Sequence, residues 1–574
     1  MSKPTRSPLP IILVRGFGGL DVAQERKDTY QRFNIGTVYP HKKGDNYIYE
    51  GMLLRFVKSK WRYQDAVNVI KYDDISDKGD TLKDYQAFIP YDQIKRSSYP
   101  GVLEKFERLK DEGFFCYDCV MLDPSMALYL LESSEDPWQT LWVFRYYDLG
   151  NRDFNRYGQS LVRTINIIRE LTAKSEADGT LIKPKVNIIA HSMGGLVVRN
   201  ALQNAYPELG EKAENYINKI VTLGTPHRGI AFQILENWIS LRGSKSPEQE
   251  LERFNQKRQK NPDNPEAFVN FQKYFPLDRL LAVVGTNYHT YKPFASTLNR
   301  IFSSAGEFGP NYNRSDGLVK QSSAHIPGAP RTFVHKCHGG EDSLISSRES
   351  YEIATRFFFG DVGVRLLFVE GKATLGMDLF GKSEFFIGVS IKPRGVDFEL
   401  FHQSKEAENC YGPFRKSDPG DTQKNVNPSE TNVNFSETNV NFSETMDEIA
   451  FPWIEVDERD RKLMWEGHLN TALIVGNSQD DTAEKDMVFR LEFYVSERDL
   501  LGLGFSDNVI FSKQYYVRAL LNKNPLELEL YTNQRKMTGG MPMEYDNGGW
   551  NFEIKGTGFR GTFRIELQRI PLEG

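Results

Sequence analysis

The stretch Val186-Asn187-Ile188-Ile189-Ala190-His191-Ser192-Met193-Gly194-Gly195 decides the fold of this chain. Its first half is a short apolar run rich in β-branched residues, which predicts a buried strand. Small residues then predict a sharp turn, and an apolar helical pattern follows from Leu196 to Ala205. A serine at a tight strand-to-helix turn is typical of a nucleophile elbow, where the residues around the serine must be small. Ala190 and Gly194 meet that requirement on either side of Ser192.

This turn predicts a reactive role for Ser192. The helix that follows would point its N-terminal amide groups at the serine, and such amides stabilise a developing negative charge. The alternative is a glycine-rich turn without chemistry. We favour the catalytic interpretation because a strand precedes the turn, a helix follows it, and Gly194-Gly195 stand directly behind the serine.

Length and composition narrow the class of protein. The chain has 574 residues, which predicts two or three domains, and its 39% hydrophobic and 26% charged residues are ordinary for a soluble protein. A net charge of −5 gives no basic footprint for nucleic acid, so we expect no nucleic-acid partner. No apolar run approaches the ~18 residues of a transmembrane segment. Residues 1–14 carry no signal-peptide pattern, so we expect a cytoplasmic location, with leaderless export as the alternative.

The chain contains four cysteines, which are too few for a disulfide framework. Cys116-x-x-Cys119 could be a redox motif or half of a zinc site, but the sequence has no second pair and the flanking residues are apolar. Buried, reduced thiols are the better interpretation, and we expect no metal site.

Two regions differ in their periodicity. Strand and helix patterns alternate from Pro10 to Gly360, which predicts an α/β fold with a mainly parallel sheet covered by helices. Beyond Gly360, apolar residues alternate with period two and no helices intervene, which predicts an antiparallel β-sandwich-like domain. We therefore expect a catalytic domain at 1–360 and a β domain at 361–574.

Three segments break these patterns. Residues 21–98 are polar and aromatic and are expected to form an insertion. The region 230–275 holds an apolar helical pattern that could form a lid over a pocket, or could instead pack on the core. Within 418–446 a seven-residue unit occurs three times, as NVNPSET and twice as NVNFSET, which predicts an exposed loop or, alternatively, short strand turns.

A glycine-rich loop, Arg15-Gly16-Phe17-Gly18-Gly19, follows the first predicted strand. Such a loop lets backbone N–H groups face a ligand without obstruction by side chains. A plain glycine turn is one alternative. A dinucleotide-binding loop is a weaker one, because the glycine spacing is not G-x-G-x-x-G.

Four motifs together carry a family resemblance: Val14–Gly19 (VRGFGG), Ala190–Gly195 (AHSMGG), Leu223–Gly229 (LGTPHRG) and Ser315–Val319 (SDGLV). In this order they resemble the α/β-hydrolase lipases and esterases with an Ala-His-Ser-Met-Gly-Gly elbow, over roughly Pro10 to Gly360. The chain departs from that family where Arg15 replaces the usual His of the first loop. The C-terminal β domain is not part of the resemblance.

The resemblance implies roles for particular residues. The amides of Phe17 and Met193 would form the oxyanion hole, and the catalytic groups would follow the order Ser, acid, His. That order selects Asp316 as the acid and His338, on a glycine-flanked loop after the last strand of the α/β region, as the base. Glu341 and Asp342 lie too close to His338 in sequence to be its usual partner. Weaker candidates for the base are His335, His325 and His227.

We therefore expect a serine hydrolase of carboxylic esters, lipase- or esterase-like, acting on an ester or lipid small molecule and needing no cofactor. An acyltransferase, thioesterase or amidase could use the same three residues. A binding or scaffolding protein with an inactive hydrolase domain is a third alternative, which the presence of Ser192, Asp316 and His338 in the right order disfavours.

Overall fold

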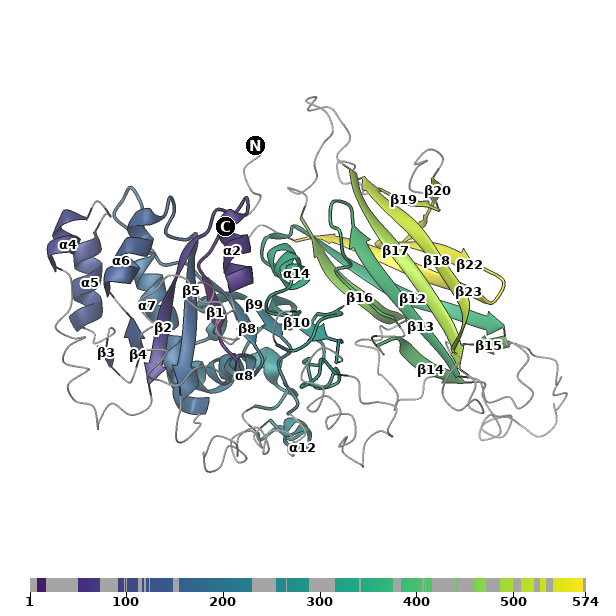
Figure 1. Ribbon diagram of the computed structural model, residues 1–574, viewed down its shortest axis with the longest axis horizontal. Helices are drawn as coiled ribbons and strands as arrows, with labels where there is room; N and C mark the ends of the chain where they lie inside the picture. The colour runs from purple at the N-terminus through teal and green to yellow at the C-terminus, as the bar shows by residue number, and fades with distance from the viewer. Residues whose placement is uncertain are drawn as a thin grey trace, which may run out of the picture.

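The computed structural model describes residues 8–16, 50–72, 91–97, 99, 101–111, 116–117, 120–122, 124–147, 154–229, 254–264, 266–288, 315–339, 342–374, 384–404, 407, 409–415, 439–441, 459, 461–470, 486–498, 507–520, 527–532 and 540–570. An α/β region and a β-sandwich lie next to each other along the long axis of the molecule (Figure 1).

The α/β region is built on one sheet. Its strand order is β11 (Arg331–Val334), β10 (Leu280–Gly285), β9 (Ile217–Leu223), β8 (Val186–His191), β1 (Ile11–Val14), β5 (Thr140–Tyr147), β2 (Gln64–Tyr72), β4 (Val120–Leu122) and β3 (Cys116–Tyr117). Every pairing from β11 to β2 is parallel, and β4 and β3 add an antiparallel edge.

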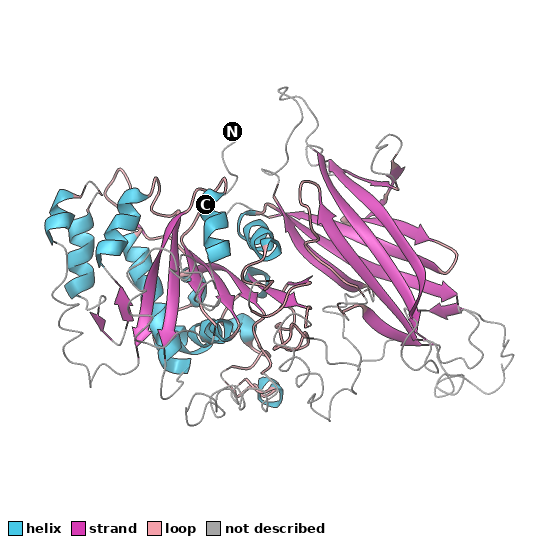
Figure 2. Cartoon of the chain, viewed as in Figure 1, coloured by secondary structure: helices cyan, strands magenta, loops and turns pink. Residues whose placement is uncertain are grey.

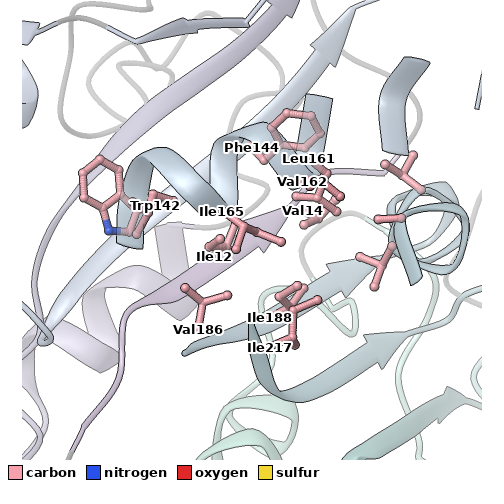
Figure 3. Packing of buried hydrophobic residues seen from close by; sticks show 14 of the residues in the cluster. Ile12, Val14, Trp142, Phe144, Leu161, Val162, Ile165, Val186, Ile188 and Ile217 are labelled. Atoms are coloured by element: carbon pink, nitrogen blue, oxygen red, sulfur yellow. The ribbon is translucent and has the colours of Figure 1, made fainter. Parts of the chain in front are cut away.

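The alternation of side chains along β1 explains why both faces of the sheet are covered. Ile12 and Val14 enter one apolar cluster, and Ile11 and Leu13 enter another, so successive residues point to opposite faces. Figure 3 shows Ile12 beside Ile165 and Val14 beside Leu161, both residues of helix α7 (Phe154–Leu171). All four β1 side chains are fully buried, as expected for a central parallel strand.

Helices form the outer layers (Figure 2). The first cluster draws on the helices α5 (Val102–Asp111), α6 (Pro124–Ser133), α7 (Phe154–Leu171) and α8 (Met193–Asn200). The opposite face is covered by α2 (Glu50–Lys58) and α14 (Arg348–Phe359), which contact each other. The described residues also contain the helices α4 (Tyr91–Arg96), α9 (Tyr206–Glu208) and α12 (Gln256–Gln259), the π-helical turn η2 (Ala201–Ala205), and the 3₁₀ helices η3 (Ala213–Asn215), η4 (Phe271–Lys273) and η5 (Leu277–Arg279).

The expectation of an insertion over residues 21–98 is wrong for two of its parts. Helix α2 packs on the core through Met52 and Phe56, and β2 is a strand of the main sheet between β5 and β4. The sequence of β2, QDAVNVIKY, does not predict a strand, because polar residues interrupt its apolar pattern. The rest of that segment lies largely outside the described residues.

The region after Gly360 forms two antiparallel sheets. One contains β15 (Asn439–Asn441), β12 (Val362–Thr374), β23 (Phe559–Arg569), β22 (Gly549–Lys555) and β21 (Glu544–Asp546), with β16 (Lys462–Leu469) also paired to β12. The other contains β14 (Tyr411–Arg415), β13 (Glu384–Pro393), β17 (Asp486–Arg498), β18 (Asp507–Leu520), β19 (Glu527–Tyr531) and β20 (Met541–Pro542).

The two sheets pack face to face through aromatic side chains. The rings of Phe493 and Phe563 lie 4.4 Å apart, and those of Phe511 and Phe559 lie 5.5 Å apart. The predicted fold class, a helix-covered parallel sheet followed by an antiparallel β-sandwich-like domain, is confirmed.

The sandwich is joined to the edge of the parallel sheet. The amide of His402 donates to the carbonyl oxygen of Phe333 at 3.1 Å, and the Thr332 hydroxyl donates to that of Leu400 at 2.8 Å. The rings of Phe333 and Phe401 lie 5.5 Å apart within a shared apolar cluster. The edge strand β11 is thereby protected from further strand pairing.

Other expected segments are described only in part. In the third repeat copy, Asn439–Asn441 forms β15 and pairs with β12, while most of 418–446 lies outside the described residues. The apolar helical pattern at 232–241, in the candidate lid, also lies outside the described residues. No helix within the described ranges is long and apolar enough to span a membrane.

Candidate active site

Ser192 stands at the turn between β8 and α8. Its φ of 52° and ψ of −127° are unusual for a residue with a side chain. Such a conformation costs about 1–3 kcal/mol and persists only where its surroundings enforce it. The Ser192 amide donates to the carbonyl oxygen of Leu223 at 2.9 Å, and its own carbonyl accepts from Gly195 at 3.0 Å. The turn therefore fixes the serine between two neighbouring parallel strands.

The space around the turn explains its small residues. A Cβ atom added to Gly194 would lie 2.7 Å from the carbonyl oxygen of Val14. One added to Gly16 would lie 2.7 Å from Nδ1 of His191. Either substitution would force the first loop away from the serine, because a real Cβ atom essentially never comes within 3.0 Å of such a neighbour.

The structure brings Ser192, His338 and Asp316 into one hydrogen-bonded relay. Nε2 of His338 lies 2.9 Å from Oγ of Ser192, and Nδ1 lies 2.8 Å from Oδ2 of Asp316. All three side chains are buried, with 6%, 3% and 1% exposure in the order Ser192, His338, Asp316. Burial away from water strengthens these hydrogen bonds and holds the imidazole in one orientation.

The Asp316 carboxylate is fixed by its own loop. Oδ1 accepts hydrogen bonds from the amides of Leu318 at 3.0 Å and Val319 at 2.7 Å. Oδ2 therefore remains directed at His338. The amide of His338 also donates to the carbonyl oxygen of Asp316 at 2.9 Å, which ties the two loops together.

Two further residues, His191 and Gly224, lie against the loop or side chain of His338 and were not predicted from the sequence. His191 places its Nε2 2.9 Å from the carbonyl oxygen of His338, and the two rings lie 4.8 Å apart. Burial and the neighbouring His338 lower the pKa of His191 well below its usual 6.5. Gly224, with a φ of 55°, lies against the Asp316–His338 hydrogen bond. The LGTPHRG motif contains this glycine, but only the fold shows what it contacts.

The other candidate histidines lie outside the relay. His335 Nδ1 lies 3.1 Å from the Thr286 hydroxyl, and His227 Nε2 lies 3.1 Å from the Thr222 hydroxyl. Both His227 and His325 are buried beside arginines, and burial lowers the pKa of each imidazole well below its usual 6.5. Both rings therefore favour the neutral form.

Of the two amides predicted to form the oxyanion hole, only that of Met193 lies within the described residues. Met193 is the first residue of α8, so its amide belongs to the first turn, where amides lack an acceptor within the helix. Phe17 lies outside the described residues. Among the residues that the structure describes, no group of three or more His, Cys, Asp or Glu side chains could hold a metal ion. Cys337 and Cys410 are buried, reduced thiols, and Cys119 lies outside the described ranges.

This strand order, with a strained serine after β8 and a buried imidazole and carboxylate from later loops, is that of the α/β-hydrolase fold. Residues 136–260, which include the serine turn, match the family model described as the PGAP1-like alpha/beta domain. No curated protein matches the chain.

Among solved structures, the phospholipase PlaB from Legionella pneumophila is similar. Its complex with thio-NAD matches at 10% identity and a TM-score of 0.25, covering 72% of this chain and 88% of that one. A second PlaB structure matches at 12% identity and a TM-score of 0.25, covering 69% and 83%.

Proposed function

We propose that this protein is a serine hydrolase that cleaves carboxylic esters through an acyl-enzyme on Ser192. The relay from Ser192 through His338 to Asp316 carries the proposal, because it supplies a nucleophile, a base and an orienting acid within hydrogen-bond distance. The α/β-hydrolase fold supports the proposal, because Ser192, Asp316 and His338 follow one another along the chain in the order that this chemistry uses in that fold.

In the first half of the reaction, His338 takes the Ser192 proton on Nε2 while Oγ attacks the acyl carbonyl. Asp316 holds the Nδ1–H tautomer and stabilises the imidazolium. His338 then returns the proton to the departing alkoxide, and the C–O bond of the ester breaks. Water, activated by the same imidazole, attacks the acyl-enzyme and releases the acid.

The tetrahedral intermediates carry a negative oxygen. The Met193 amide at the start of α8 is one proposed donor to it, and the Phe17 amide is the second. Because an oxyanion donor is typically worth about 10²–10³-fold in kcat, these two amides are central to the proposed chemistry.

We place lipid esters among the substrates because the four motifs resemble those of lipases and esterases. A series of p-nitrophenyl esters of increasing acyl length tests this directly. A preference for long chains supports a lipase, and a preference for short chains supports an esterase.

Labelling with a fluorophosphonate probe tests the nucleophile. The wild type should be labelled and should hydrolyse the esters, and Ser192→Ala should lose both properties while keeping the melting temperature near or above that of the wild type. Ser134→Ala, directly after α6, is a matched control that should retain both. Undiminished turnover by Ser192→Ala would refute the assignment.

The nature of the acceptor is a separate question. An acyltransferase, thioesterase or amidase would form the same acyl-enzyme. Product analysis with competing alcohol, thiol and amine acceptors distinguishes them, and free acid as the main product supports a hydrolase.

A further inference from the structure

A cavity of about 380 Å³ opens between α2 and α14, on the sheet face opposite α7 and α8. Its walls come from the end of α2, the turn 59–61, the exposed side of α14 and Asn470 beyond β16. Figure 1 shows α2 and α14 next to each other at the centre of the molecule. None of Ser192, Asp316 and His338 lines this cavity, so it is separate from the relay.

The lining is strongly basic. Arg55, Lys58, Lys60 and Arg348 contribute four cations, and Glu352 is the single acid. The excess of positive charge in this lining contrasts with the net charge of −5 of the whole chain. Like charges gathered in one concave site repel each other, and low-dielectric walls strengthen the effect.

Nearby acids offset this charge only in part. Glu352 lies 3.6 Å from Arg356, and Glu349, just outside the cavity, lies 3.5 Å from Lys336, so both acids are shared with other cations. Burial and the neighbouring Arg348 lower the pKa of Arg55, and the charge of Glu349 acts in the opposite direction. Burial and Arg356 likewise lower the pKa of Lys60, and the charge of Glu352 acts in the opposite direction. An anion in the cavity would relieve the repulsion.

The walls are preformed rather than loose. The Trp61 ring stacks on Phe359 at 3.9 Å, and Tyr351 makes an edge contact with Phe56 at 5.0 Å. Arg55 donates to the carbonyl oxygen of Ser346 at 2.8 Å, which joins α2 to the segment before α14. A preformed site loses little conformational entropy when it binds a ligand.

We infer that this cavity binds the phosphate group of a small phosphorylated molecule or of a phospholipid headgroup. Guanidinium groups match phosphate oxygens in a bidentate manner, and ammonium groups add point charges. A phosphate with up to two negative charges balances a four-cation lining better than a single carboxylate does. The volume lies in the range of ligand pockets, about 300–1,000 Å³, and exceeds the space of a simple ion.

Isothermal titration with pyrophosphate and with glycerol 3-phosphate, at constant ionic strength, tests the site. The pocket variant is Lys58→Gln/Arg348→Gln, which removes two exposed cations of the lining. The matched control is Lys95→Gln/Arg96→Gln on α4, which removes one lysine and one arginine from another exposed surface. Circular dichroism and melting temperature establish that both variants fold.

We expect the wild type and the control to bind pyrophosphate with the same affinity, and the pocket variant to bind it at least tenfold more weakly. Flotation with vesicles of phosphatidylcholine, with and without phosphatidylglycerol, shows whether the bound phosphate group belongs to a lipid headgroup or to a soluble molecule. Flotation only with the anionic vesicles, abolished in the pocket variant, assigns the site to headgroups. Binding of glycerol 3-phosphate without flotation assigns it to soluble ligands.

Equal binding of pyrophosphate by the pocket variant and the wild type would overturn the inference, as would a wild type that binds none of these probes. Because the readout is binding rather than turnover, the result does not depend on whether Ser192 is a nucleophile.

Discussion

Nε2 of His191 lies 2.9 Å from the carbonyl oxygen of His338, so the residue before the serine holds the loop that carries the imidazole. Since burial keeps His191 neutral, its ring has one N–H, and the carbonyl is a suitable acceptor for it. The nucleophile turn and the base loop, 147 residues apart in sequence, are thereby joined.

Removing this link should impair turnover more than binding. We predict that His191→Leu lowers kcat for p-nitrophenyl esters by roughly tenfold with little change in KM, because a lost hydrogen bond of about 1 kcal/mol would loosen His338. His191→Gln, which retains a donor, should recover part of the loss. If both variants lose activity only in proportion to their lower thermal stability, the role of His191 is structural alone.

The carboxylate of Asp316 should be needed for its charge and not only for its shape. In Asp316→Asn, the Oδ1 contacts to Leu318 and Val319 can persist, but an amide group facing Nδ1 would favour the wrong imidazole tautomer. We expect kcat to fall about 10³–10⁴-fold with a small change in melting temperature. A variant with more than a tenth of wild-type kcat would show that another group orients His338.

Gly224 should be intolerant of a side chain. A Cβ there would lie 2.8 Å from Oδ2 of Asp316 and 3.2 Å from Nδ1 of His338. We predict that Gly224→Ala lowers kcat/KM on the order of a hundredfold, because a small displacement of reacting groups has a large effect. Gly210→Ala is the matched control, with a φ of 72° and no atom within 4 Å of the added Cβ. It should cost about 1 kcal/mol of stability and leave activity unchanged.

Stability should fall at acidic pH. His191, His227 and His325 are buried, and each has a folded-state pKa well below 6.5, so the unfolded chain binds more protons than the folded chain in mildly acidic solution. The contribution of these neutral rings to the free energy of unfolding is therefore present above pH ~6.5 and is lost as the pH falls below that value. Urea unfolding at pH 7.5, 6.0 and 5.0 measures this.

The variant His325→Gln provides the corresponding control. Its free energy of unfolding should depend less on pH than that of the wild type, because one buried titrating group is gone. An unchanged slope would mean that carboxylates, rather than these histidines, dominate the acid response.

Much of the fold and of the candidate site was predictable from local patterns. The β8 strand, the small residues around Ser192 and the helix after it are each a short-range signal, since burial alternates with the period of the element. The change to period-two patterns after Gly360 likewise indicated the antiparallel sheets. Strand β2 was missed because its place in the sheet comes from pairing with β5 and β4, and not from an apolar pattern of its own.

By itself, the sequence determined where the serine turn lies, which loops hold an acid and a histidine in the right order, and which regions form each kind of sheet. Only the tertiary structure decided that His191 holds the His338 loop, that Gly224 lies against the relay, and that four cations from α2, the turn after it and α14 share one cavity. The physical reason is distance along the chain. Propensity and periodicity act over a few residues, whereas Arg55 contacts Ser346 across 291 positions, and such contacts exist only once the sheet brings its layers together.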